Sequence, residues 1–129
     1  MGINEADREM ISEITQMGMR AAILLKGVLI KKVDRGTLEW GLQEINASSL
    51  MNKYAARISN NPDYVQVFNL LALVSSLEDQ LDYQIQEYGI DSLKDDLEEI
   101  NTSLRSVGLQ FDPNQLQTDT EKISKCHSK

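Results

Sequence analysis

The chain has 129 residues, with thirteen Lys/Arg against twenty Asp/Glu and a single cysteine. This length predicts one domain, one cysteine excludes an internal disulfide framework, and a net charge of −7 disfavours direct binding to a nucleic-acid backbone. No run of roughly 20 apolar residues suits a membrane span, and the N-terminus lacks the basic-then-apolar order of a signal peptide. We therefore expect a soluble, cytoplasmic protein.

The charge is unevenly distributed along the chain. Residues 1–60 carry eight Lys/Arg and seven Asp/Glu, whereas residues 61–129 carry five and thirteen. The first part is close to neutral and the second is strongly acidic, which favours attraction to a basic protein surface. The alternative is that the acidic side chains only keep a small protein in solution.

The first predicted helix covers residues 4–32, with Asn4 as its N-cap. Its apolar residues recur at alternating spacings of four and three, the heptad pattern of a helix seam. Gly18 lies beside the seam, and a glycine inside a helix predicts the close approach of another helix. The seam suits either an intramolecular bundle or a homodimer. Its residues are Met10, Ile14, Met17, Ala21, Leu24 and Val28.

A basic turn follows at residues 31–36. Lys31, Lys32 and Arg35 lie where positive charge complements the dipole at the C-terminal end of the first helix. A contact to a small anion is the alternative interpretation.

The second helix is predicted over residues 38–59, with Thr37 as its N-cap. Its apolar stripe changes face near Asn46, which predicts a bend or two different packing partners. Trp40, the only tryptophan, lies off this stripe. Its usual place would be the partly buried edge of the core, and its functional alternative is an anchor in a protein interface.

The central helix is predicted over residues 62–88, the longest apolar-rich segment. Asn61 can cap it, and Pro62 suits the first helical position. Gly89 is expected to end it in a left-handed conformation. The turn at residues 59–63 joins it to the second helix as an antiparallel hairpin. Its apolar residues are Val67, Phe68, Leu70, Leu71, Val74, Leu77, Leu81, Ile85 and Tyr88.

A fourth helix is predicted after a cap at Asp91 or Ser92, with its end at Gly108. Leucine, isoleucine and valine recur along it at spacings of four and three. Phe111, just beyond the predicted end, is expected to touch the core.

The predicted fold class is all-α. Four helices joined by short connections indicate a four-helix bundle-like domain with a central helical hairpin. This domain is predicted to cover residues 1–111. From residue 112 the composition turns polar and Pro113 interrupts regular structure, so residues 112–129 are expected to form a mobile tail.

Residue types with catalytic chemistry are scarce. The only histidine, His127, is adjacent to Cys126 in the predicted tail, where no third group orients the pair. The seven glycines form no phosphate-binding loop. We expect no enzymatic activity, no cofactor and no metal site. The enzymatic alternative is a metal-dependent phosphohydrolase that uses carboxylates on neighbouring helices.

The densest charge lies between Glu78 and Glu99, with nine acidic residues and one basic residue, Lys94. Like charges this close oppose folding slightly, and a basic partner would neutralise them. We therefore expect a non-enzymatic module that binds a basic, nucleic-acid-binding protein, in the form of an inhibitor, immunity protein or antidefence protein. It is expected to contact neither nucleic acid nor membrane directly. The alternative is a helical assembly subunit or chaperone that acts through apolar seams. The predicted binding residues are Glu78, Asp79, Asp82, Asp95, Asp96, Glu98, Glu99 and Trp40.

Overall fold

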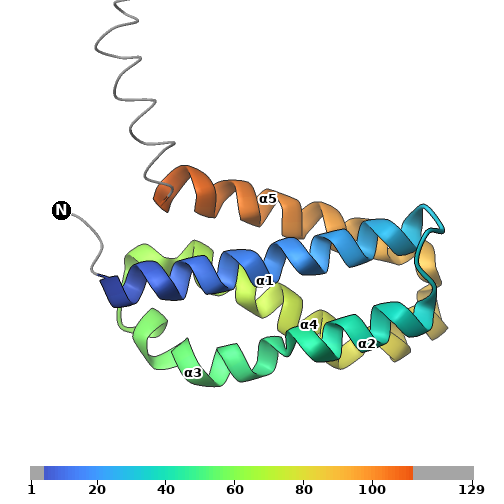
Figure 1. Ribbon diagram of the computed structural model, residues 1–129, viewed down its shortest axis with the longest axis horizontal. Coiled ribbons are helices and arrows are strands. Elements are labelled where there is room, and N and C mark those ends of the chain that lie inside the picture. The colour runs from blue at the N-terminus through green and yellow to red at the C-terminus, as the bar shows by residue number, and fades with distance from the viewer. Residues whose placement is uncertain (1–4, 112–129) are drawn as a thin grey trace, which may run out of the picture.

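The computed structural model describes residues 5–111, and all regular structure in that range is helical (Figure 1). The prediction of an all-α, four-helix bundle-like fold is confirmed. The predicted tail, with Cys126 and His127, lies outside the described residues. The elements are α1 (Glu5–Leu29), α2 (Arg35–Ile45), α3 (Ala47–Ser59), the 3-10 turn η1 (Pro62–Tyr64), α4 (Val65–Tyr88), the 3-10 turn η2 (Ile90–Ser92) and α5 (Leu93–Phe111).

The helices surround one core. α1 packs against α5 on one side, against α2 on the other, and against α4 across the middle of the bundle. α4 packs in turn on α3 and α5. α2 and α3 follow one another along the same side of the molecule, so together they occupy the place of one long helix (Figure 1).

The predicted second helix is two helices, because the chain breaks at Asn46. Asn46 has φ 52° and ψ 60°, a left-handed conformation that asparagine tolerates better than most residues. Its N–H donates to Leu42 O at 3.0 Å, and its side chain accepts from the Ser49 N–H at 3.3 Å. One residue therefore ends α2 and caps α3. The predicted bend is confirmed, and the prediction of one continuous helix is wrong.

The connection between α1 and α2 differs from the prediction at both ends. α1 ends before residue 32, because Lys31 takes a left-handed conformation (φ 64°) that is typical of a helix C-terminus. α2 begins at Arg35, and its N-cap is Asp34 instead of Thr37. Asp34 Oδ1 accepts a hydrogen bond from the Thr37 N–H at 2.7 Å. This bond holds the pKa of the Asp34 carboxyl below its usual value.

The central helix is confirmed except for its first turn. The Asn61 side chain acts as a cap, as predicted, and accepts from the Asp63 N–H at 3.0 Å. The turn that it caps is 3-10, and α4 begins at Val65. Gly89 ends α4 with φ 85° and ψ 166°. The positive φ that favours glycine is present, but the backbone is extended rather than left-handed helical.

The last helix continues past Gly108 to Phe111, so the predicted end at Gly108 is wrong. Tertiary contacts to the η1 turn hold the extra residues. Gln110 Nε2 donates to Asp63 O at 2.8 Å. The Phe111 ring meets the Tyr64 ring edge to face, with the centroids 5.5 Å apart, and the expected contact of Phe111 with the core is confirmed.

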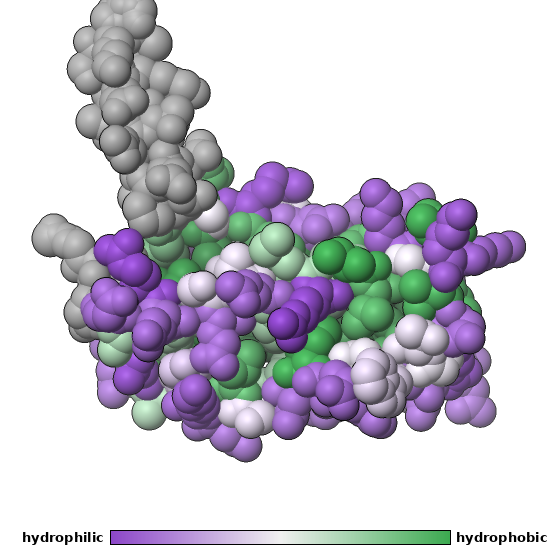
Figure 2. Space-filling view, in the orientation of Figure 1, coloured by the Kyte–Doolittle hydropathy of each residue, from purple (hydrophilic) through white to green (hydrophobic). Residues whose placement is uncertain are grey.

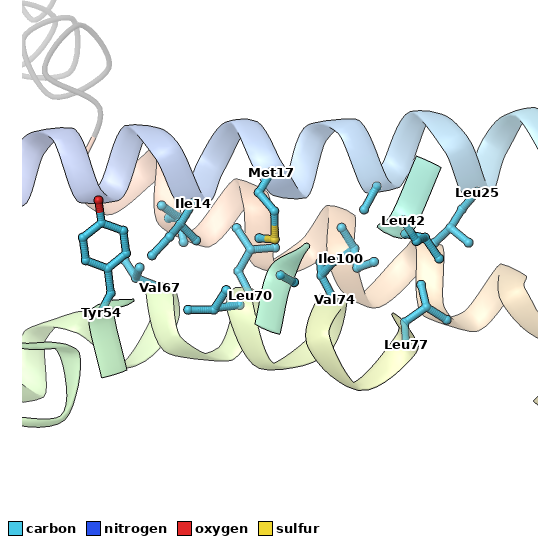
Figure 3. Packing of buried hydrophobic residues seen from close by; sticks show 14 of the residues in the cluster. Ile14, Met17, Leu25, Leu42, Tyr54, Val67, Leu70, Val74, Leu77 and Ile100 are labelled. Carbon is cyan, nitrogen blue, oxygen red and sulfur yellow. The ribbon is translucent and has the colours of Figure 1, made fainter. Parts of the chain in front are cut away.

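The apolar seam of α1 faces the core. Figure 3 shows Ile14 and Met17 of α1 beside Leu70 and Val74 of α4, with Ile100 of α5 completing the cluster. The bundle therefore uses the seam that also suited a homodimer. Self-association would require a different surface. The buried residues of α1 are Met10, Ile11, Ile14, Met17, Gly18, Ala21, Leu25, Gly27 and Val28.

Gly18 lies where α1 closely approaches its neighbours, as predicted. A Cβ atom at this position would lie 2.9 Å from Leu70 Cδ1 and 3.1 Å from Leu104 Cδ2. These distances are shorter than ordinary carbon–carbon contacts. The missing side chain therefore lets α1 approach both α4 and α5.

Candidate protein-binding surface

The turn of the α4–α5 hairpin positions most of the predicted acidic residues. The Gly89 N–H donates to Ile85 O at 2.8 Å and closes α4. Ser92 Oγ donates to Gly89 O at 2.7 Å. Gln84 of α4 then donates through Nε2 to Ser92 Oγ and to Asp96 Oδ2. These contacts fix the first turn of α5 against the last turns of α4.

An open groove of about 920 Å³ lies between α4 and α5. Three exposed acidic residues of α5, Asp95, Glu98 and Glu99, contribute to its lining. Most of the remaining lining is small or uncharged, and it includes Ala72, Ser76, Ser103 and Ser106. The groove therefore combines negative charge with little steric obstruction.

A second, smaller hollow of about 380 Å³ includes Asp95 and Asp96 and two tyrosines. The Tyr83 and Tyr88 side chains are 60% and 69% exposed. Their rings meet edge to face with centroids 6.5 Å apart. Asp95 lines both hollows, so the tyrosine pair adjoins the acidic part of the groove.

Four predicted binding residues point to solvent without an internal partner. Asp79, Asp95, Glu98 and Glu99 are exposed. Within residues 5–111, none of these four carboxylates makes a hydrogen bond or an ion pair. They are available to an external cation, and three of them lie at the groove.

Glu78 is engaged inside the molecule. It is half-buried, and its Oε1 accepts a hydrogen bond from the Ala47 N–H at 3.2 Å. Ala47 is the first residue of α3, so the carboxylate lies where the helix dipole favours negative charge. Burial raises the pKa of Glu78, and the Ala47 N–H partly opposes that shift. The structure therefore gives Glu78 a role in anchoring α3.

Asp82 also faces the α2–α3 side of the bundle. Its Oδ1 lies 2.8 Å from Nη2 of Arg35, and this contact lowers the pKa of Asp82. Arg35 Nε also contacts Glu39 at 2.9 Å. The expectation that Arg35 serves the C-terminal end of the first helix is therefore wrong. Arg35 instead links the start of α2 to α4.

The predicted acidic residues thus differ in whether another part of the chain contacts their carboxylates. Glu78 and Asp82 contact α3 and α2, Asp96 contacts Gln84 between α4 and α5, and the other four carboxylates are unpaired. Spacing along a helix could not separate these cases, because it does not specify which helix lies beside each face.

Trp40 is 63% exposed on α2, so a partly buried place at the core edge is wrong for it. The anchor interpretation stays a prediction. Exposed apolar residues also lie on α1, at Met19 and Ile23, and directly after its end, at Ile30. The face that α1 fronts shows apolar side chains among polar ones (Figure 2).

Sequence patterns did not find the tyrosine pair. Tyr88 was expected in the apolar stripe of the central helix, but it is the last residue of α4 and is exposed. Tyr83 falls outside that stripe. The available signal was the placement of two tyrosines among acidic residues, since tyrosine is enriched at protein interfaces.

Within residues 5–111, no group of three or more His, Cys, Asp or Glu side chains is arranged to hold a metal ion. Among the same residues, no helix is both long and apolar enough to cross a membrane. Comparisons with protein-family models, with curated proteins and with solved structures found no match to this chain.

Proposed function

We propose that this protein is a non-enzymatic binding module that presents its α4–α5 face to a basic surface of another protein. An inhibitor, immunity protein or antidefence protein that blocks a nucleic-acid-binding protein is the biological form that suits such a surface. The observation that carries the proposal is the set of unpaired carboxylates at Asp95, Glu98 and Glu99 beside the open groove.

The charge on this face suits recognition more than stability. Unpaired carboxylates this close repel one another, and no basic side chain in residues 5–111 pairs with those at the groove. A cationic partner would remove that repulsion and would be steered toward the face during association. Tyr83 and Tyr88 add exposed aromatic area on which an arginine side chain can stack.

Charge reversal at the groove tests the proposal. The variant changes Asp95, Glu98 and Glu99 to lysine, and it spares Asp82 and Asp96 because their carboxylates serve internal contacts. The matched control reverses three exposed glutamates elsewhere and so carries the same net charge. The glutamates of the control are Glu5, Glu9 and Glu44.

The readout is quantitative capture of proteins from the native host lysate. The native chain and the control are expected to capture the same partner at about 0.05 M salt and to release it at about 0.5 M, where screening is strong. The groove variant is expected to lose that partner at both concentrations. Equal capture by both variants, or capture that salt does not weaken, would contradict the proposal.

The exposed apolar residues of α1 favour a second candidate, an assembly subunit that acts through helix contacts. Met19 and Ile23 are 51% and 69% exposed on α1, and Ile30, directly after the end of that helix, is 54% exposed. This candidate predicts that the mass measured by light scattering rises with protein concentration and that Ile23→Glu abolishes the rise. A constant monomer mass would remove it.

A further inference from the structure

The α4–α5 groove has the length of a short helix. It is lined from Gln66 to Ser76 on α4 and from Asp95 to Ser106 on α5. At 1.5 Å per residue both spans are roughly 15 Å, which is close to three helical turns. Small side chains along these spans, such as Ala72 and Ser76, allow another helix axis to approach within the usual packing distance.

Ser103 provides an independent sign that the groove is incomplete. This residue lines the groove and is 7% exposed. Its hydroxyl has no hydrogen-bond partner among the described residues. Buried hydroxyl groups in folded proteins are nearly always paired, and an unpaired one calls for an explanation. The hydroxyl is covered in the free chain, so a polar side chain in the groove would supply the missing partner once the groove side chains over it shift.

The charge of the groove is polarised along its length. Asp95, Glu98 and Glu99 lie on the first two turns of α5, whereas Gln66 and Asn69 line the other end from the first turns of α4. An occupant that matches this pattern is cationic at one end and polar but uncharged at the other. The carboxylates oppose a phosphate-bearing ligand, and the open form suits a segment that lies along the surface.

We infer that this groove is the docking site for one α-helix of the basic partner, about three turns long and with its arginines or lysines over the first turns of α5. This inference rests on the proposed function and specifies how the partner is recognised. It is a helix-in-groove contact, in which shape and charge both contribute, rather than attraction to an acidic surface alone.

The probes are two forms of one synthetic peptide of about fifteen residues, which exceeds the length of the groove. The peptide carries arginines at one end and alanines and serines along one face. One form is stapled as a helix and the other is left unstapled, so both carry the same charge. Binding to the full chain is measured by fluorescence anisotropy at low and high salt.

Two phenylalanine variants test whether peptide binding depends on the groove or only on the surface charge. Ser76→Phe places a large ring in the groove at an exposed position, and Ser12→Phe makes the same change at an exposed position of α1. The stapled peptide is expected to bind the native chain about tenfold more tightly than the unstapled form, because its ordering cost is already met. Ser76→Phe is expected to abolish that advantage, and Ser12→Phe to retain it.

Ser103→Ala distinguishes a role of Ser103 in docking from a purely structural role, because only a docking role affects binding of the peptide. Removing an unpaired buried hydroxyl is expected to raise the melting temperature of the free chain. It is also expected to weaken binding of the stapled peptide by about threefold to tenfold, which corresponds to the loss of one hydrogen bond. An alanine variant that is more stable and binds the stapled peptide unchanged would contradict a role for Ser103 in docking.

The outcomes distinguish the two proposals. If both peptide forms bind equally and Ser76→Phe has no effect, the groove inference fails while the acidic binding module stands. If neither form binds at low salt, the acidic binding module fails and the groove inference fails with it. If the stapled peptide does not bind and cross-links between two copies of the free chain fall in the groove, a second copy is the occupant and the inference is overturned.

Discussion

Two glycines offer a direct test of how closely α1 packs in this bundle. Gly18 lies in the middle of α1 and Gly108 in the last turn of α5, so alanine makes the same chemical change within a helix at both positions. A Cβ at Gly18 would lie 2.9 Å from Leu70 Cδ1, whereas a Cβ at Gly108 would meet nothing within 4 Å. The two substitutions therefore differ chiefly in packing.

The expected magnitudes follow from that difference. Alanine in place of glycine inside a helix stabilises it by about 1 kcal/mol. Gly108→Ala is expected to show most of this gain, because Gly108 lies in the last turn of α5 and meets no steric obstacle. At Gly18 the same gain is opposed by an overpacking cost of about 1–3 kcal/mol, because Leu70 is fully buried and its methyl group cannot move into solvent. Gly18→Ala is therefore expected to be neutral or to lower stability by up to about 2 kcal/mol.

Urea unfolding followed by far-ultraviolet circular dichroism measures both variants. For a domain of this size, 1 kcal/mol corresponds to roughly 4 °C in melting temperature, so a thermal scan provides a second readout. The free energy of unfolding of Gly108→Ala should exceed that of Gly18→Ala by about 1–3 kcal/mol. Equal stabilisation by the two alanines would refute the close approach of α1 to α4 and α5.

Three further predictions concern single residues. Asn46→Ala should cost about 1–2 kcal/mol in urea unfolding and Asn46→Gly only a few tenths, because both lose the side-chain cap but glycine keeps the left-handed backbone; equal losses would contradict this. Burial and the hydrogen bond to Asp7 raise the pKa of Tyr64 to about 12. In the unfolded chain the Tyr64 hydroxyl ionises near pH 10. Its contribution to folding stability is therefore complete below pH 10 and is lost as the pH rises toward 12. Melting temperature should therefore fall less steeply above about pH 10 in Tyr64→Phe than in the native chain, and identical slopes would argue against it. Trp40 fluorescence should be quenched by acrylamide almost as efficiently in the folded chain as in urea, given its 63% exposure; strong protection of the monomer would contradict that exposure.

The helices were predictable because each must bury an apolar stripe, whatever neighbour covers it. The spacing from Met10 to Val28 and the stripe from Val67 to Ile85 identified most of the buried residues of α1 and α4. Asn61 identified the start of the hairpin through a local hydrogen bond. These signals involve residues close together in the chain, and so they can be interpreted from the sequence without knowledge of the fold.

Helix ends were less predictable where distant residues compete with local signals. Gly108 suggested a helix end, but the contacts of Gln110 and Phe111 with the η1 turn carry α5 further. Thr37 suggested a cap, but Asp34 forms it. In both places the local pattern allowed more than one solution, and additional contacts selected one.

The same contrast between local patterns and tertiary contacts applies to the candidate binding surface. Composition and helical period were enough to predict that the second half of the chain is acidic and that its carboxylates lie off the leucine stripes. The packing of the helices determines that Glu78 and Asp82 contact α3 and α2, whereas Asp95, Glu98 and Glu99 are unpaired beside a groove. A carboxylate is paired or unpaired according to which donor the fold brings within about 3 Å of it, and the donors here, the Ala47 N–H and the Arg35 side chain, lie more than thirty positions away in the sequence.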